Sequence, residues 1–68
     1  MRYAIVIEKA GNNFSAYAPD LPGCIATGAT LAAVEAEMQL AVWFHVDGLK
    51  QDGLPLPAAT SVAEYVDT

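Results

Sequence analysis

Two short stretches near the N-terminus show the alternation of side chains that is typical of β-strands. The first covers residues 2–8, where Tyr3, Ile5 and Ile7 fall on one face, and the second covers residues 14–18. Residues 9–13 between them are rich in Gly and Asn, as hairpin turns are. The pattern predicts an antiparallel hairpin. Because both faces of its first strand are apolar, we expect one face to pack on a helix and the other to be available to a second subunit.

A distinctive turn motif separates this hairpin from a short third strand, expected over residues 24–27. The motif consists of Pro19, Asp20, Leu21, Pro22 and Gly23. Pro19 has no N–H and therefore ends the strand ladder. Asp20 is expected to accept hydrogen bonds from backbone N–H groups two residues on. Gly23 is free to adopt a positive φ. The motif is therefore interpreted as an architectural hinge that places the third strand beside the hairpin.

A long helix is predicted from Leu31 to Asp47 or Leu49, with Thr30 as its N-cap. Its apolar residues recur at the spacing of one helical face, which is expected to pack on the sheet. That face consists of Leu31, Val34, Met38, Ala41, Val42, His45 and Leu49.

Beyond the helix, the Leu-Pro-Leu-Pro segment at residues 54–57 is expected to be extended, and residues 61–66 alternate like a final strand. The predicted fold is therefore α+β, with the order β-β-β-α-β: an antiparallel meander, one long helix packed on it, and a C-terminal strand. The length of 68 residues corresponds to a single domain over residues 1–68, and we expect no DNA-binding domain after the last strand.

The opposite side of the helix carries a second apolar stripe that a helix lying on a small sheet does not require. This outer stripe consists of Ala33, Ala36, Leu40, Trp43 and Phe44. Either a terminal segment folds over it, or it is an interface, where Trp and Phe are enriched. The interface is the interpretation favoured, and it predicts that Trp43→Ala or Trp43→Glu lowers the mass of the assembly.

The composition also points to self-association. A domain of 68 residues buries a small core, yet 54% of this chain is hydrophobic. One Cys and one His provide neither an internal disulfide nor a four-ligand zinc site. Association remains as the means of stabilisation, so a homo-oligomer, dimer or tetramer, is expected. The single cysteine without an export signal fits the cytoplasm, and no apolar run is long enough to span a membrane.

The chain carries eight acidic and three basic residues, a net charge of −5. An acidic surface repels phosphate, so direct binding of nucleic acid is not expected. It suits a basic protein partner, although the same acidity also serves simply to keep a small protein in solution.

No constellation of residues predicts catalysis, a cofactor or a metal. His45 falls on the helix face that meets the sheet, Cys24 lacks the surroundings of an activated nucleophile, and the acidic residues do not cluster. The candidate functional residues are instead contacts to another protein chain. They are Leu40, Trp43, Phe44, Asp47, Glu35 and Asp20.

An ordered set of motifs resembles the HicB family of antitoxins across nearly the whole chain. The set comprises Pro-Asp-Leu-Pro-Gly-Cys at 19–24, Thr27, Gly28, Thr30 and Leu31 at the helix entry, then Gly48, Leu49, Asp52, Gly53, Pro55 and Pro57. The resemblance implies a partial RNase H-like fold. It also implies docking onto HicA, a small basic RNA-cleaving toxin with a double-stranded-RNA-binding fold, which the antitoxin neutralises without catalysis of its own.

Two departures and two alternatives accompany this resemblance. Many family members carry a C-terminal DNA-binding domain that this chain is expected to lack, and Trp43 stands where a polar residue is expected. One alternative is a solitary homo-oligomeric module, regulatory or scaffolding, without a toxin partner. The other is a small nuclease of RNase H-like ancestry that depends on Asp20.

Overall fold

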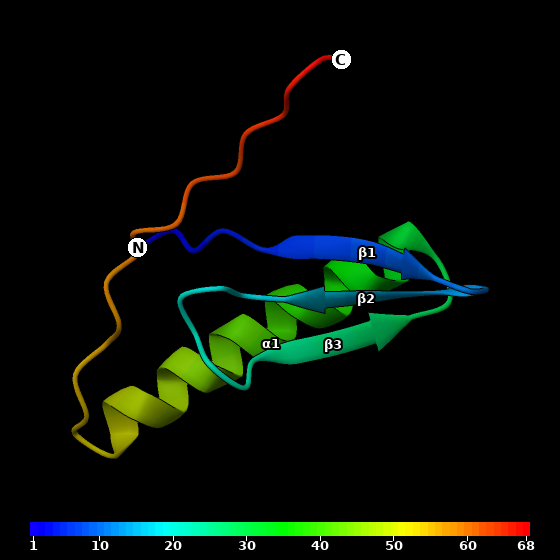
Figure 1. Cartoon of the computed structure of the whole chain (residues 1–68). Coiled ribbons are helices and arrows are strands. Elements are labelled where there is room, and N and C mark those ends of the chain that lie inside the picture. Colours follow the sequence, from blue (N-terminus) through cyan, green and yellow to red (C-terminus); the bar gives the residue numbers. More distant parts are fainter.

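The computed structural model describes all 68 residues and contains three strands followed by one long helix (Figure 1). The strands β1 (Val6–Ala10), β2 (Asn13–Tyr17) and β3 (Ile25–Gly28) form an antiparallel sheet in the order β1-β2-β3. The helix α1 (Leu31–Gln51) packs on one face of this sheet. The predicted α+β class, with a three-stranded meander and one helix, is confirmed.

The strand register directs alternate side chains toward the helix. Ile7 of β1 lies opposite Ala16 of β2, which in turn lies opposite Ala26 of β3. Ala16 is buried, and the other two pack against the core. Tyr17, next to Ala16 in β2, points to the opposite face and is exposed. The sheet thus has an inner face that meets α1 and an outer face without a covering layer.

β1 begins at Val6, four residues later than the predicted start at Arg2. The ladder between β1 and β2 ends at the pair Val6–Tyr17, because Tyr17 is the last residue of β2. Ala18, the residue after β2, donates its N–H to the carbonyl of Cys24 at 3.2 Å, and Pro19 has no N–H to donate. Residues 2–5 therefore lead into β1 without forming a ladder.

The loop between β2 and β3 is built around a buried leucine. Leu21, only 1% exposed, donates its N–H to the Ala18 carbonyl at 3.1 Å and accepts from the Cys24 N–H at 3.0 Å. Gly23 adopts a φ of 81°, the left-handed region that a side chain would disfavour. The loop is therefore anchored from inside rather than being a free surface loop.

α1 begins at the predicted N-cap. The Thr30 hydroxyl accepts a hydrogen bond from the Ala33 N–H at 3.0 Å, and the Thr30 backbone is extended, as an N-cap requires. The helix continues past Leu49 to Gln51, where the N–H of Asp52 bonds to the Gly48 carbonyl. Its 21 residues are long enough to reach beyond the sheet.

The core is small. Val34 and Met38 of α1 are fully buried, and only four other residues are buried with them: Ala16, Ala18, Leu21 and Cys24. Ala41, Val42 and Val46 are partly buried around this cluster. Leu31 was predicted to lie on the helix face that packs on the sheet. It is 49% exposed, so the prediction that the sheet buries it is wrong.

The position of α1 explains why Leu31 is left at the margin. The helix packs mainly on β3 and β2 and only marginally on β1. It approaches β3 so closely that a Cβ atom at Gly28 would lie 2.6 Å from the Val34 nitrogen, well inside van der Waals contact. The helix is therefore offset toward one edge of the sheet, and the side of β1 is left uncovered.

The predicted fourth strand is not formed. After α1 the chain returns without regular structure, and residues 61–66 make no ladder (Figure 1). The last seven residues, 62–68, form a C-terminal arm that projects away from the sheet. Its apolar side chains are almost fully exposed: Val62 by 78%, Tyr65 by 98% and Val66 by 86%. Hydrogen bonds at residues 60 and 61, described below, join the base of the arm to Asp20 in the β2–β3 loop.

Gly28→Ala tests the close approach of helix and sheet. The added methyl group would force α1 away from β3, so we expect a loss of about 1–3 kcal/mol in the free energy of unfolding, measured by urea denaturation. Gly48→Ala is the matched control, because the space around Gly48 is open and the residue lies within the helix. That control should gain about 0.5–1 kcal/mol. Equal urea midpoints for Gly28→Ala and the wild type would contradict the tight contact.

Candidate protein-interaction site

The outer stripe of α1 lies open to solvent. Leu40 is 53% exposed, Trp43 is 60% exposed and Phe44 is 63% exposed, on the side of the helix opposite Val34 and Met38. The Trp43 and Phe44 rings stand edge to face, with centroids 5.2 Å apart and an angle of 82° between their planes. This geometry is favourable for aromatic pairs and holds the two rings in a defined arrangement before any partner binds. No terminal segment folds over the stripe.

Acidic side chains flank the large residues of the outer stripe, Leu40 to Phe44, on both sides along the helix. Asp47 lies one helical turn beyond Trp43, and its carboxylate accepts a hydrogen bond from the Gln51 side chain at 2.8 Å. Glu37 lies one turn before Leu40 and is exposed. Glu37 was not among the predicted contacts, although its i, i+3 spacing from Leu40 already places the two side chains next to each other on the helix.

Asp20 has a different role from the one predicted. Its carboxylate accepts four hydrogen bonds: from the Thr60 N–H at 3.0 Å and hydroxyl at 3.3 Å, and from the Ser61 N–H at 2.9 Å and hydroxyl at 2.8 Å. The expected local bonds within the turn are replaced by bonds to residues 40 and 41 positions later. We call this arrangement the Asp20 clamp. It joins the β2–β3 loop to the base of the C-terminal arm.

The clamp changes the acidity of its carboxyl group. The Ser61 N–H is the main cause that lowers the pKa of Asp20 below its ordinary value of 3.8, and the Ser61 hydroxyl and the two Thr60 donors act in the same direction. The ionised form is therefore the form that holds the arm. An aspartate engaged in this way is less available to a partner than the exposed acids of α1.

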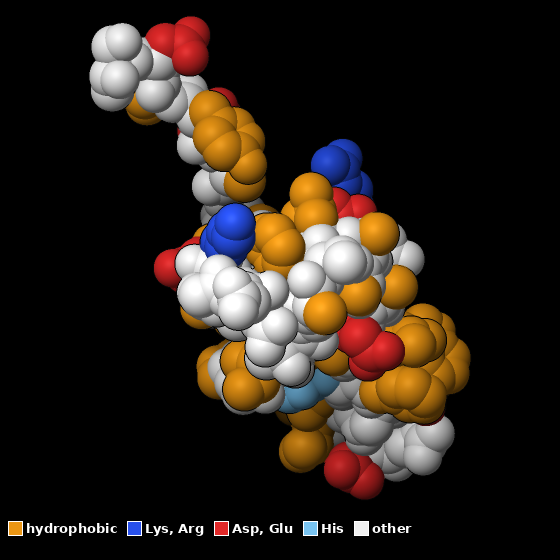
Figure 2. All heavy atoms as spheres, turned by 90° about the vertical axis from the view of Figure 1, so that its right-hand side faces the viewer, with side chains coloured by type: hydrophobic (Ala, Val, Ile, Leu, Met, Phe, Trp, Pro, Cys, Tyr) orange, Lys and Arg blue, Asp and Glu red, His pale blue; other side chains and the backbone are white.

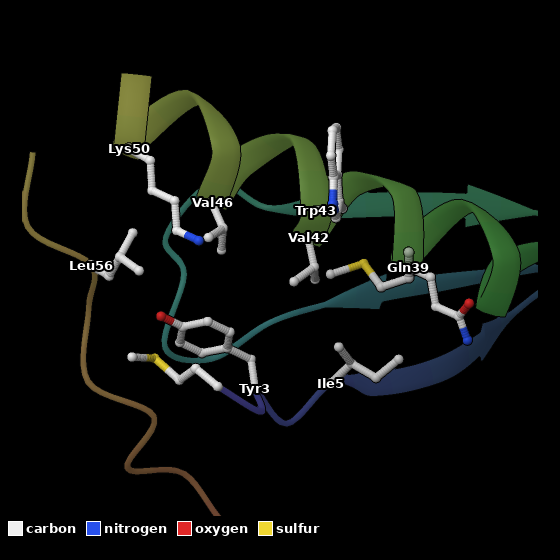
Figure 3. A pocket seen from close by; sticks show the side chains of 10 residues that line it. Tyr3, Ile5, Gln39, Val42, Trp43, Val46, Lys50 and Leu56 are labelled. Atoms are coloured by element: carbon white, nitrogen blue, oxygen red, sulfur yellow. The ribbon is translucent and has the colours of Figure 1, made fainter. Parts of the chain in front are cut away.

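A first groove runs between α1 and the residues that precede β1 (Figure 3). Its volume is about 420 Å³, and eight of its ten lining residues are hydrophobic. Tyr3 and Ile5 face Val42 and Val46 across it, and Trp43 stands at its rim. The Tyr3 hydroxyl donates a 2.7 Å hydrogen bond to the Pro57 carbonyl, which fixes the wall nearest Leu56. The groove is thus continuous with the outer stripe through Trp43.

A second groove, of about 790 Å³, lies between β1, the start of α1 and the C-terminal arm. Its lining is Ile5, Val6, Ile7, Lys9, Phe14, Leu31, Glu35 and residues 62–65 of the arm. Glu35, predicted to act together with Trp43, lies here instead. The two grooves share Ile5 and together follow the side of β1 that α1 leaves uncovered.

Comparison with known proteins decides the family. A family model described as the HicB-like antitoxin of bacterial toxin–antitoxin systems matches residues 3–68. The chain belongs to the HicB-like antitoxin family. A phage protein described as an uncharacterized 14.9 kDa protein of the rep-hol intergenic region, from Haemophilus phage HP1, is 33% identical over 67 residues. That match covers 98% of this chain and 50% of the phage protein, so the chain spans about half the length of this relative.

A solved structure is also similar to this HicB-like chain. It is a chain of a HicA3 and HicB3 toxin–antitoxin complex, matched with a TM-score of 0.74 and 33% sequence identity. The match covers 88% of this chain and 70% of the other. The arrangement of sheet and helix is therefore shared with a member of a toxin–antitoxin assembly.

The remaining reactive side chains of the HicB-like chain lie apart from the outer stripe and from each other. Cys24 is buried, and this burial raises the pKa of its thiol. His45 is half-buried. No group of three or more His, Cys, Asp and Glu side chains is placed to hold a metal ion. α1 does not combine the length and apolar character that crossing a membrane would require.

Asp20→Ala should release the base of the arm. We expect hydrogen exchange at the Thr60 and Ser61 amides to become at least about tenfold faster, because both N–H groups lose their acceptor. Asp52→Ala removes an exposed acidic residue of the same type and should leave these two amides unchanged.

The Asp20 clamp should also depend on pH. Because its pKa is lower in the folded chain than the ordinary 3.8, the clamp contributes fully above that pH and is lost as the pH falls through the lowered value. Chemical shifts of the Thr60 and Ser61 amides should follow this transition. The shifts in Asp20→Asn, which does not titrate, should stay flat. A titration in the wild type at or above 3.8 would contradict the clamp.

Proposed function

We propose that this HicB-like chain is an antitoxin that binds and neutralises a small, basic, RNA-cleaving toxin of the HicA type. Membership of the HicB-like antitoxin family supports the role, and so does the similarity to a chain of a HicA3 and HicB3 toxin–antitoxin complex. Neutralisation occurs by protein–protein docking in the cytoplasm. The antitoxin contributes no catalytic group, and the toxin is held in a form that cannot reach its RNA.

The outer stripe is the observation that carries this proposal. Trp43 and Phe44 are more than half exposed and are held edge to face, which suits the aromatic anchors of a binding hot spot. Glu37 and Asp47 flank them, and the net charge of −5 draws a basic toxin toward the surface. A standard interface of about 1,200–2,000 Å² in total would require the stripe together with the adjoining first groove.

Co-expression tests the antitoxin role directly. We expect the chain to rescue growth of cells that produce the HicA-type protein encoded beside it, and to co-purify with that protein. Growth arrest that persists despite a normal level of the folded chain, with no co-purification, would refute the proposal.

Trp43→Glu should abolish this co-purification, since it places a charge at the centre of the apolar contact. We expect the dissociation constant, measured by calorimetry, to rise by about a hundredfold or more, as for other hot-spot residues. Ile25→Glu is the matched control, because Ile25 is 70% exposed and lies on β3 rather than on α1. Equal losses for both variants would show that the outer stripe has no special role.

A second candidate function is a solitary homo-oligomeric HicB-like module, regulatory or scaffolding, without a toxin. The observation that favours it is the ratio of six buried residues to eleven exposed large hydrophobic ones. It predicts a stable assembly of the chain alone and no partner in the co-expression experiment. Light scattering on Trp43→Glu separates the two candidates: a lower mass of the chain alone assigns the outer stripe to self-association, and an unchanged mass leaves it for the toxin.

A further inference from the structure

The edge of β1 is the most incomplete part of the fold. β1 is bonded only to β2, so the N–H and C=O groups along its other edge have no strand partner. α1 packs mainly on β3 and β2 and therefore does not cover this edge. The second groove, of about 790 Å³, lies directly beside it. An open strand edge next to an apolar hollow is a template for the addition of another strand.

The C-terminal arm is a strand-like segment that lacks a pairing partner. Residues 62–66 read Val-Ala-Glu-Tyr-Val and alternate like a strand, but they have no ladder partner. Tyr65 is 98% exposed and Val66 is 86% exposed, on an arm whose end projects from the body of the molecule (Figure 2), while residues 62–65 form one wall of the second groove. An unpaired edge and an unpaired strand-forming segment thus occur in the same chain, on the same side of the sheet.

We infer that the arm of a second copy of this chain lies in the second groove and adds a strand to the free edge of β1. The exchange is reciprocal, so that each copy gives its arm and receives the other. This exchange of arms would explain the self-association of the second candidate function, the homo-oligomeric module. The exchange does not depend on the presence of a toxin. The product is a closed two-fold dimer in which each sheet has four strands.

The Asp20 clamp favours a neighbouring copy over the chain's own edge. It holds the amides of Thr60 and Ser61, so the direction in which the arm leaves is determined immediately before Val62. That direction leads away from the sheet. The chain's own residues 62–65 lie across the second groove from residues 5–7 and form no ladder with β1, so the edge of β1 stays free for the arm of a second copy while the clamp is intact.

The chemistry of the two surfaces also matches. The groove offers apolar contacts from Ile7, Phe14 and Leu31, and Lys9 at its far end is one of only three basic residues in the chain. The arm brings apolar side chains together with two acidic residues, Glu64 and Asp67. Burial of Tyr65 alone removes about 150–250 Å² from water, and a reciprocal exchange counts each contact twice.

Disulfide cross-linking distinguishes a neighbour's arm from the chain's own arm. Starting from Cys24→Ala, which removes the native thiol, Lys9→Cys is combined with Glu64→Cys, Tyr65→Cys or Val66→Cys in turn. The purified chain alone is oxidised and its mass is measured without reductant. We expect covalent dimers from at least one pair. A monomer with an internal disulfide, or no disulfide from any pair, would overturn the inference.

Ile25→Cys replaces Lys9→Cys in the control, since Ile25 is exposed but belongs to the opposite edge strand, and it should give no dimer. Tyr65→Glu supplies a second measurement that does not depend on cysteine geometry. We expect it to raise the dimer dissociation constant at least tenfold, while Leu54→Glu, also at an exposed apolar position, leaves it unchanged.

An unchanged dissociation constant in Tyr65→Glu would also overturn the inference. Because no toxin is present in either measurement, failure here leaves the antitoxin proposal intact. Failure of toxin co-purification likewise leaves the exchange of arms intact.

Discussion

The close approach of α1 to β3 is the contact on which the rest of this small structure depends. A glycine at position 28 lets the helix backbone come so near that the Val34 nitrogen would lie 2.6 Å from a Cβ atom there. This contact brings Val34 and Met38 over β2 and β3 and buries them completely. It also moves the helix away from β1. The two grooves, the partly exposed Leu31 and the open strand edge all result from the same offset, so the best-packed part of the molecule and its least complete part have one cause.

A core of six residues gives limited stability, because a chain of this size buries only a modest share of its surface. Much of the apolar surface of this HicB-like chain is therefore available for contacts with other proteins. The outer stripe is well suited to a partner of opposite charge, since acidic residues flank its aromatic pair. The edge of β1 is suited to a strand. Any protein that binds only the folded chain also stabilises it, so binding and folding are thermodynamically coupled here.

Local signals in the sequence were sufficient for most of the fold. The spacing of apolar residues located the three strands and the helix, and Thr30 identified the helix start to the residue. Long-range partners could not be found in this way. Asp20 was expected to bond within its own turn, but its acceptor oxygens are used by residues 60 and 61, and no local pattern encodes a contact across 40 positions. The alternation at residues 61–66 predicted a strand that is not formed, because alternation does not say whether a strand edge is available for pairing. Glu35 and Trp43 were both predicted as contacts from the acidic charge and the outer stripe, but they line different grooves, which only the position of β1 relative to α1 reveals.

The hydrogen bonds that Tyr3 and Asp20 make with residues 57–61 span 40 to 54 positions. Closing such long loops is entropically unfavourable until the elements between them are in place. Synthesis proceeds in the same order, because the residues of the hairpin and the helix are added before Pro57 and Ser61. The segment that carries the arm is therefore the last to be fastened. A newly made chain passes through a stage in which the sheet and helix are assembled while its C-terminal end still has no defined direction.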